Sequence, residues 1–316
     1  MKKTILTIAS VLLFSAGAMA QTADEVNAKF NEAATLYNNK DYNGAITALE
    51  KTVEMSQSSS DDCLATMTEA QSYLAKCYRN LGVQDASAGR FDDAAEKLTK
   101  ARDLSEMADP AGVRAIESVL SKVYKAKAST ALKAEDFVSA AKSYEQAIAV
   151  NNKDTEAMLL AAQCYGKSGD FDKAGELYTA VIELGKTHSK YEAAAASAKD
   201  AYVTDLLSSA VKASDDYASA RTLIMKAIEV DPASEQANML LLQSANNAKD
   251  FDTVISYGDA AIAAQTTPEA KSNACFLVAV AAQTKGDNAK AVKYYQQVTA
   301  GPNASTAKAQ VAALNK

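Results

Sequence analysis

Residues 155–186 read TEAMLLAAQCYGKSGDFDKAGELYTAVIELGK, and this stretch decides the fold. Small and apolar side chains recur in each half at steps of three and four, a spacing that places them on one face of a helix. Gly169-Asp170-Phe171 separates the two halves. The stretch therefore predicts two helices joined by a tight turn.

The phrase at this turn is an acidic residue, an aromatic residue and, three positions after the aromatic, an alanine. It recurs as Asp41-Tyr42 with Ala45, Asp136-Phe137 with Ala140 and Asp216-Tyr217 with Ala220, and more weakly as Arg90-Phe91 with Ala94, Asp250-Phe251 with Val254 and Asp287-Asn288 with Ala291. Phe137 and Phe171 are 34 residues apart, as are Tyr217 and Phe251. Self-similarity at a fixed period of this length is typical of helical repeat arrays.

These residues resemble the tetratricopeptide repeat, a helix–turn–helix unit of about 34 residues. The resemblance implies an all-α solenoid of about seven repeats that winds as a right-handed superhelix. It implies one solenoid domain, residues 21–316, with repeats at 26–55, 64–105, 111–152, 155–186, 190–232, 235–265 and 270–302 and a capping helix at 305–315.

Three repeats begin with extra residues, because the spacing of the phrase exceeds 34 before the second, third and fifth repeats. In two of them the surplus keeps a helical stripe of apolar residues: Leu64, Met67, Leu74, Cys77 and Leu81, then Val113, Ile116, Leu120 and Val123. We therefore expect lengthened first helices in the second, third and fifth repeats.

Residues 1–20 have the three parts of a signal peptide. Lys2 and Lys3 precede the apolar run 5–14, and Ala18-Met19-Ala20 offers small residues for cleavage. Gln21 stands where a lipoprotein carries cysteine. The pattern predicts an exported bacterial protein, periplasmic or secreted, without an integral membrane segment in the mature chain, since no later run reaches the roughly 20 apolar residues of a membrane helix.

The composition argues against several kinds of chemistry. The chain has 33 basic and 39 acidic residues and a net charge of −6, which excludes duplex nucleic acid as the expected partner. Its single histidine, His188, cannot assemble a metal cluster or a nucleophile–base couple, so we expect no cofactor, no metal and no enzymatic activity. The four cysteines lie too far apart to form disulfides, so we expect free, buried thiols. The acidic pairs Asp61-Asp62, Asp92-Asp93 and Asp215-Asp216 are interpreted as helix-start residues.

The resemblance also implies where a partner binds, along the face lined by the first helix of each repeat. It assigns to this face the basic residues Lys76, Arg79, Lys122 and Lys125, and the residues Gln163, Lys167, Gln243, Asn246, Asn247 and Gln283. Further positions carried over are Ser129, Lys133, Tyr202, Asp205, Met239 and Phe276. Our hypothesis is that the basic residues anchor an extended acidic segment while the amides bond its main chain.

Two functions fit this reading. The first is a non-catalytic scaffold or adaptor in the cell envelope that holds a protein or extended peptide. The alternative is a structural subunit of an envelope assembly or secretion machine, held through its long helices. The fold does not choose between them, because function is determined by the site and not the scaffold.

Overall fold

The computed structural model of the protein describes residues 22–59 and 63–315, with only the backbone described at residues 107 and 108. The expected signal peptide at 1–20, Gln21 and the pair Asp61-Asp62 lie outside the described residues.

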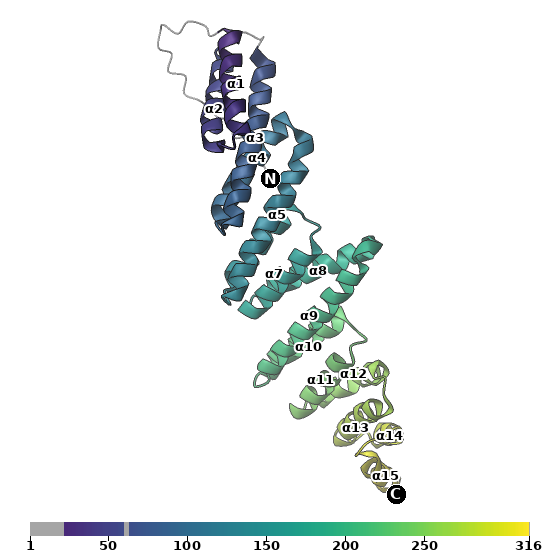
Figure 1. The fold of residues 1–316 in the computed structure, drawn as a ribbon. Helices are drawn as coiled ribbons and strands as arrows, with labels where there is room; N and C mark the ends of the chain where they lie inside the picture. Colours follow the sequence, from purple (N-terminus) through teal and green to yellow (C-terminus); the bar gives the residue numbers. More distant parts are fainter. Residues whose placement is uncertain (1–21, 60–62, 316) are drawn as a thin grey trace. The chain divides into compact units, whose positions relative to one another are not determined.

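Within residues 22–59 and 63–315 the chain forms fifteen α-helices and no strand (Figure 1). The odd-numbered helices up to α13 are the first helices of successive helix pairs, the even-numbered helices are the second, and α15 follows the last pair. Their bounds are α1 Ala23–Asn38, α2 Tyr42–Gln57, α3 Leu64–Ser87, α4 Phe91–Ala108, α5 Pro110–Lys133, α6 Phe137–Val150, α7 Thr155–Ser168, α8 Phe171–Thr187, α9 Glu192–Lys212, α10 Tyr217–Val230, α11 Glu235–Asn247, α12 Phe251–Ala264, α13 Pro268–Thr284, α14 Asn288–Tyr295 and α15 Ala304–Leu314; the 3-10 helix η2, Ser189–Tyr191, precedes α9.

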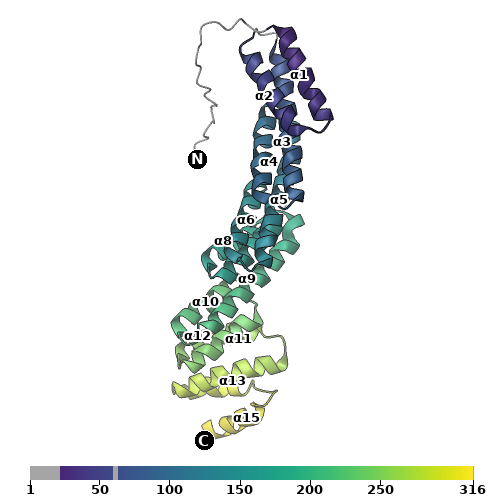
Figure 2. The ribbon, with the colours of Figure 1, turned by 60° about the vertical axis from the view of Figure 1, so that its left-hand side comes forward.

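The expected lengthening of three first helices is confirmed. Helices α3 and α5 have 24 residues each and α9 has 21, whereas α7 has 14 and α11 has 13. Figure 2 shows α3 and α4 packed together as a hairpin. At this contact Gly82 faces Leu98, and a Cβ on Gly82 would lie 2.8 Å from the Leu98 side chain, so the close approach requires glycine.

Aspartate carboxylates begin most of the second helices. The Asp170 carboxylate accepts a hydrogen bond of 3.2 Å from the backbone amide of Lys173, three residues into α8. The same contact, to the amide three positions on, is made by Asp41, Asp136, Asp250 and Asp287. This bond satisfies a backbone donor that the helix itself leaves free. The acidic position of the repeated phrase is therefore a helix N-cap.

The residue before most of the capping aspartates adopts a left-handed backbone conformation. Gly169 has a φ of 89°, in the left-handed region, and Lys40, Glu135 and Lys249 hold the same turn position at 62°, 58° and 59°. Non-glycine residues adopt this conformation at a cost, because Cβ crowds the backbone. The cap and the packed hairpin therefore fix the turn without requiring glycine.

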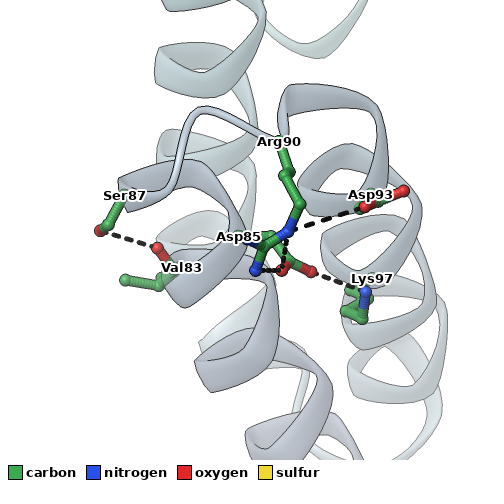
Figure 3. Close-up of polar contacts among 6 residues, drawn as sticks. All are labelled: Val83, Asp85, Ser87, Arg90, Asp93 and Lys97. Carbon is green, nitrogen blue, oxygen red and sulfur yellow. Dashed lines mark hydrogen bonds and ion pairs between the residues drawn. The ribbon is translucent and has the colours of Figure 1, made fainter.

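Helix α4 is the exception, since Arg90 stands at its N-cap and makes no side-chain cap bond. Arg90 instead pairs with the carboxylate of Asp85 of α3, which is 7% exposed. Figure 3 shows this contact. Asp85 accepts hydrogen bonds from Arg90 Nε at 3.0 Å and from Lys97 Nζ at 2.6 Å. The hydrogen bond from Lys97, and then that from Arg90, lower the pKa of Asp85. This cluster ties the end of α3 to the start and the middle of α4.

The contacts of the chain divide into two compact units. One ends at Ser129 and includes Ala149–Asn151; the other consists of Thr130–Ile148 and the chain from Asn152 onward. Each has a core rich in small residues: Ala45, Leu49, Ala70 and Leu74 in the first, and Leu242, Val254, Ala274, Val278 and Ala291 in the second. Small side chains allow close approach of neighbouring helices.

The cysteines belong to the buried part of these units. All four thiols are buried, and burial raises the pKa of Cys77 to about 11. A thiol with so high a pKa is a weak nucleophile, because the thiolate is the reactive form.

Tyrosine hydroxyls join neighbouring repeats in the second unit. The Tyr178 hydroxyl of α8 donates to Asp205 of α9 at 2.8 Å, and the Tyr217 hydroxyl of α10 donates to Asp250 at 2.8 Å. Asp250 thus caps α12 and also receives a bond from the preceding repeat. Buried hydroxyls and carboxylates that are paired in this way avoid the cost of unsatisfied polar groups.

Substitution of the phrase alanine should overpack the hairpins of the second unit. Ala174 is 2% exposed and Ala220 is 4% exposed, so a leucine at either site has no room. We expect Ala174→Leu and Ala220→Leu each to lower the free energy of unfolding by about 1–3 kcal/mol. Ala193→Leu, at an exposed position of α9, is the control and should change it by less than about 0.5 kcal/mol. Thermal unfolding reports the difference, and unchanged melting in both buried variants contradicts the packing.

Loss of the Asp85 charge should loosen the α3–α4 hairpin. In Asp85→Asn the side chains of Arg90 and Lys97 would face each other without a carboxylate between them. Both cations are partly exposed, so we expect a loss of about 1–2 kcal/mol in denaturant unfolding. Asp103→Asn, which removes an exposed carboxylate from α4, is the matched control. Equal effects of the two substitutions would mean that Asp85 has no special role.

Candidate partner-binding surface

The solvent-facing side of the first helices, here called the first-helix face, carries the residues assigned to partner binding. Neighbouring first helices contact one another: α1 contacts α3 in the first unit, and α7 contacts α9 and α11 contacts α13 in the second. Side chains from successive repeats therefore adjoin on this face within each unit.

In the second unit, α7 and α11 carry most of the predicted polar residues. Gln243 and Asn247 of α11 are exposed, and Asn246 between them is half-buried. Gln163 and Lys167 of α7 are also exposed, and the Lys167 ammonium lies 5.1 Å from the centroid of the Phe137 ring. Amides that both donate and accept can bond the main chain of a peptide without selecting its sequence.

Apolar side chains lie beside these amides. Met239 is one turn before Gln243 on α11, and Phe276 is on the neighbouring α13; both are half-buried against the core of the second unit. Phe276 also packs edge-on against Tyr295, with ring centroids 5.8 Å apart. The surface thus combines polar and apolar groups, as ligand-binding surfaces of proteins commonly do.

Gln283, also predicted to bind a partner, forms two hydrogen bonds within the chain. Its side-chain oxygen accepts a hydrogen bond of 2.7 Å from the Tyr295 hydroxyl, and its nitrogen donates to Gln310 at 3.2 Å. Both ends of the amide are therefore used within the chain, where they connect α13 to α14 and to α15. Gln283 stabilises the end of the array and is a poor candidate for contact with a partner.

Tyr202 and Asp205 were also expected on this face, and the structure corrects both positions. Tyr202 is 4% exposed and stacks on Tyr178 with ring centroids 5.2 Å apart. Asp205 is half-buried and accepts a hydrogen bond from the Tyr178 hydroxyl. Burial, and then the bond to Asp205, raise the pKa of Tyr178. These residues belong to the packing between α8 and α9.

In the first unit, the structure places the four predicted basic residues on two long helices. Lys76 and Arg79 of α3 are exposed, and the Lys76 ammonium lies 4.6 Å from the centroid of the Tyr73 ring. Lys122 of α5 is exposed and Lys125 is half-buried. Sequence reasoning missed Arg114, which lies eight residues before Lys122 and is exposed on the same helix. Counting helical steps back from Lys122 could have found it.

The described residues contain no arrangement that indicates metal chemistry. Among them, no group of three or more histidine, cysteine, aspartate or glutamate side chains is placed to hold a metal ion. His188 is exposed after α8, with its Nδ1 2.8 Å from the Thr187 hydroxyl. No helix of the described chain is both long enough and apolar enough to cross a membrane.

Comparison with known families agrees with the helix pairs. Two family models, both described as tetratricopeptide repeat, match residues 131–202 and residues 272–300. The chain is a tetratricopeptide-repeat protein. The first match covers α6, α7 and α8 and part of α9, and the second covers most of α13 and all of α14.

Several solved structures are similar to this tetratricopeptide-repeat chain. MamA of AMB-1 is 17% identical, with a TM-score of 0.34, over 60% of this chain and 98% of MamA. A tetratricopeptide repeat protein from Parabacteroides merdae ATCC 43184 is 11% identical, with a TM-score of 0.28, over 93% of this chain and all of its own. The TPR2AB-domain:pHSP90 complex of yeast Sti1 is 14% identical, with a TM-score of 0.32, over 93% and 100%. No curated protein matches the sequence. The family assignment therefore depends on the two repeat matches and the helix pairs, and not on these superpositions.

Proposed function

We propose that this tetratricopeptide-repeat protein is a non-catalytic scaffold of the cell envelope that holds a protein or an extended peptide on its first-helix face. The observation that carries the proposal is the surface of α11, where exposed Gln243 and Asn247 lie beside half-buried Met239. Apolar contact supplies affinity, and amides bond a peptide main chain without demanding one sequence. The envelope location is supported by the sequence of residues 1–20 alone.

The structural-subunit alternative is favoured by a different observation, the lengthened helices α3, α5 and α9. Their extra turns add surface that a repeat of ordinary length lacks. A partner held there would contact the first turns of α9 and not α11. The two functions therefore predict contacts at different, separately testable positions.

Site-specific photocrosslinking in cells distinguishes them. A photoreactive residue at Gln243 reports the first-helix face, one at Ala193 reports the lengthened start of α9, and one at Ser256, exposed on the second helix α12, is the control. We expect Gln243 to yield a discrete crosslinked protein that is absent from Ser256, and Gln243→Ala with Asn247→Ala, tested from a neighbouring crosslinking position, to reduce its yield.

Crosslinks from Ala193 and none from Gln243 would support the alternative. Equal products at all three positions would contradict both proposals, because contact would then be nonspecific.

A further inference from the structure

Helix α5 is strongly basic in a protein whose net charge is negative. Its 24 residues include five basic side chains and one acidic side chain, Glu117, whereas the chain has a net charge of −6. Lys127 is used internally, since it pairs with Asp92 of α4. Arg114, Lys122 and Lys133 are exposed on the same helix. They make α5 the part of the described chain where an acidic partner would be attracted most.

The basic residues share one face of the helix. Arg114, Ser118, Lys122, Lys125 and Ser129 follow one another at steps of four, four, three and four, which keeps them within about 100° of arc. From Arg114 to Ser129 the stripe extends about 22 Å along the axis. Arg114, Ser118 and Lys122 are exposed, and Lys125 and Ser129 are half-buried.

The residues between the charges are small. The other exposed positions of α5 are Pro110, Ala111, Ala115, Ala126, Thr130 and Lys133. None of the exposed side chains on this helix is aromatic or large and aliphatic, which are the groups that insert into a bilayer interface. Alanine and serine let the backbone of another helix approach closely.

Helix α3 contributes less charge to its surface than α5. It carries Lys76 and Arg79, and its Asp85 is already paired with Arg90 and Lys97 of the α4 side. Glu69 is exposed seven residues before Lys76, on the same face of α3, and offsets part of the positive charge there. An acidic partner would therefore be selected mainly by the positive charge of α5.

We propose that the Arg114–Ser129 face of α5 docks an acidic helix of a partner protein. The proposal rests on the scaffold function proposed above and names the chemistry of one partner segment. A helix repeats its charges at the same rise per residue as α5, so glutamates spaced at helical steps can meet Arg114 and Lys122 along the stripe. Charge complementarity of this kind sets the choice and the orientation of a partner.

The test uses the full mature chain and two synthetic peptides. One is a helix-forming probe with glutamates at steps of four and three on an alanine background; the other has the same charge, with glycine replacing interior alanines so that it does not form a helix. Binding is measured by fluorescence anisotropy at low and at physiological ionic strength. Arg114→Gln with Lys122→Gln removes two charges from the face, and Lys51→Gln with Lys100→Gln removes two exposed charges from α2 and α4 as a matched control.

We expect the helical probe to bind more tightly than the glycine isomer, with an affinity that falls as salt rises. The α5 variant should weaken this binding about fivefold, and the control variant should leave it unchanged. Equal losses in the two variants, no loss in either, or equal binding of the two peptides would each overturn the proposal. Photocrosslinking from Gln243 does not involve α5, so its success or failure reports the scaffold function separately.

Discussion

A carboxylate at the N-cap, the residue just before the second helix, is the contact on which most of the helix pairs depend. The Asp170 and Asp250 side chains each accept a hydrogen bond from the backbone amide three residues further along the chain. This bond fixes both the start of the helix and the end of the turn. Asp250 also accepts hydrogen bonds from the Tyr217 hydroxyl of the preceding repeat and from the Thr253 hydroxyl of the helix that it caps. Bonds from Thr253 and Tyr217 lower the pKa of Asp250, so its stabilising effect is present above about pH 4 and is lost as acid protonates it.

The start of most second helices could be predicted because the cap is a local contact. Acid, aromatic and alanine lie within five residues of each other, so their relation is visible in the sequence itself. The α4 start was harder, because Arg90 stands at its N-cap without a cap bond and pairs instead with Asp85 of α3. Asp85 also accepts a hydrogen bond from Lys97, twelve residues away on another helix. The turn residues are equally hard to recognise, since Lys40 and Glu135 hold a conformation that sequence patterns assign to glycine.

The candidate surface was predicted less well, for a related reason. Whether a side chain on a first helix faces solvent depends on what the next helix places against it. The resemblance assigns Tyr202 and Asp205 to the surface, but Tyr178 of α8 stacks on the buried Tyr202 and donates a hydrogen bond to the half-buried Asp205. The side-chain amide of Gln283 likewise forms hydrogen bonds with Tyr295 and Gln310. Gln243, Asn247, Lys122 and Arg79, by contrast, are exposed as the resemblance implied.

The two units offer different chemistry on the same kind of face. On α11 uncharged amides border apolar side chains, which suits a peptide held by its main chain. On α5 the exposed side chains are basic or small, which suits a charged helix held by ion pairs. Because each unit has its own core, substitutions on one face can be made without disturbing the packing that supports the other.

Native-state hydrogen exchange of Asp250→Ala tests the role of the capping carboxylate most directly. If the carboxylate holds the α12 start and its link to α10, amides in the first turn of α12 should exchange about 5- to 30-fold faster than in the parent protein. Amides of α8, whose N-cap is Asp170, and of α7 should keep their rates. Unchanged exchange at Thr253 and its neighbours, or a uniform increase along the whole second unit, would contradict this role of the carboxylate.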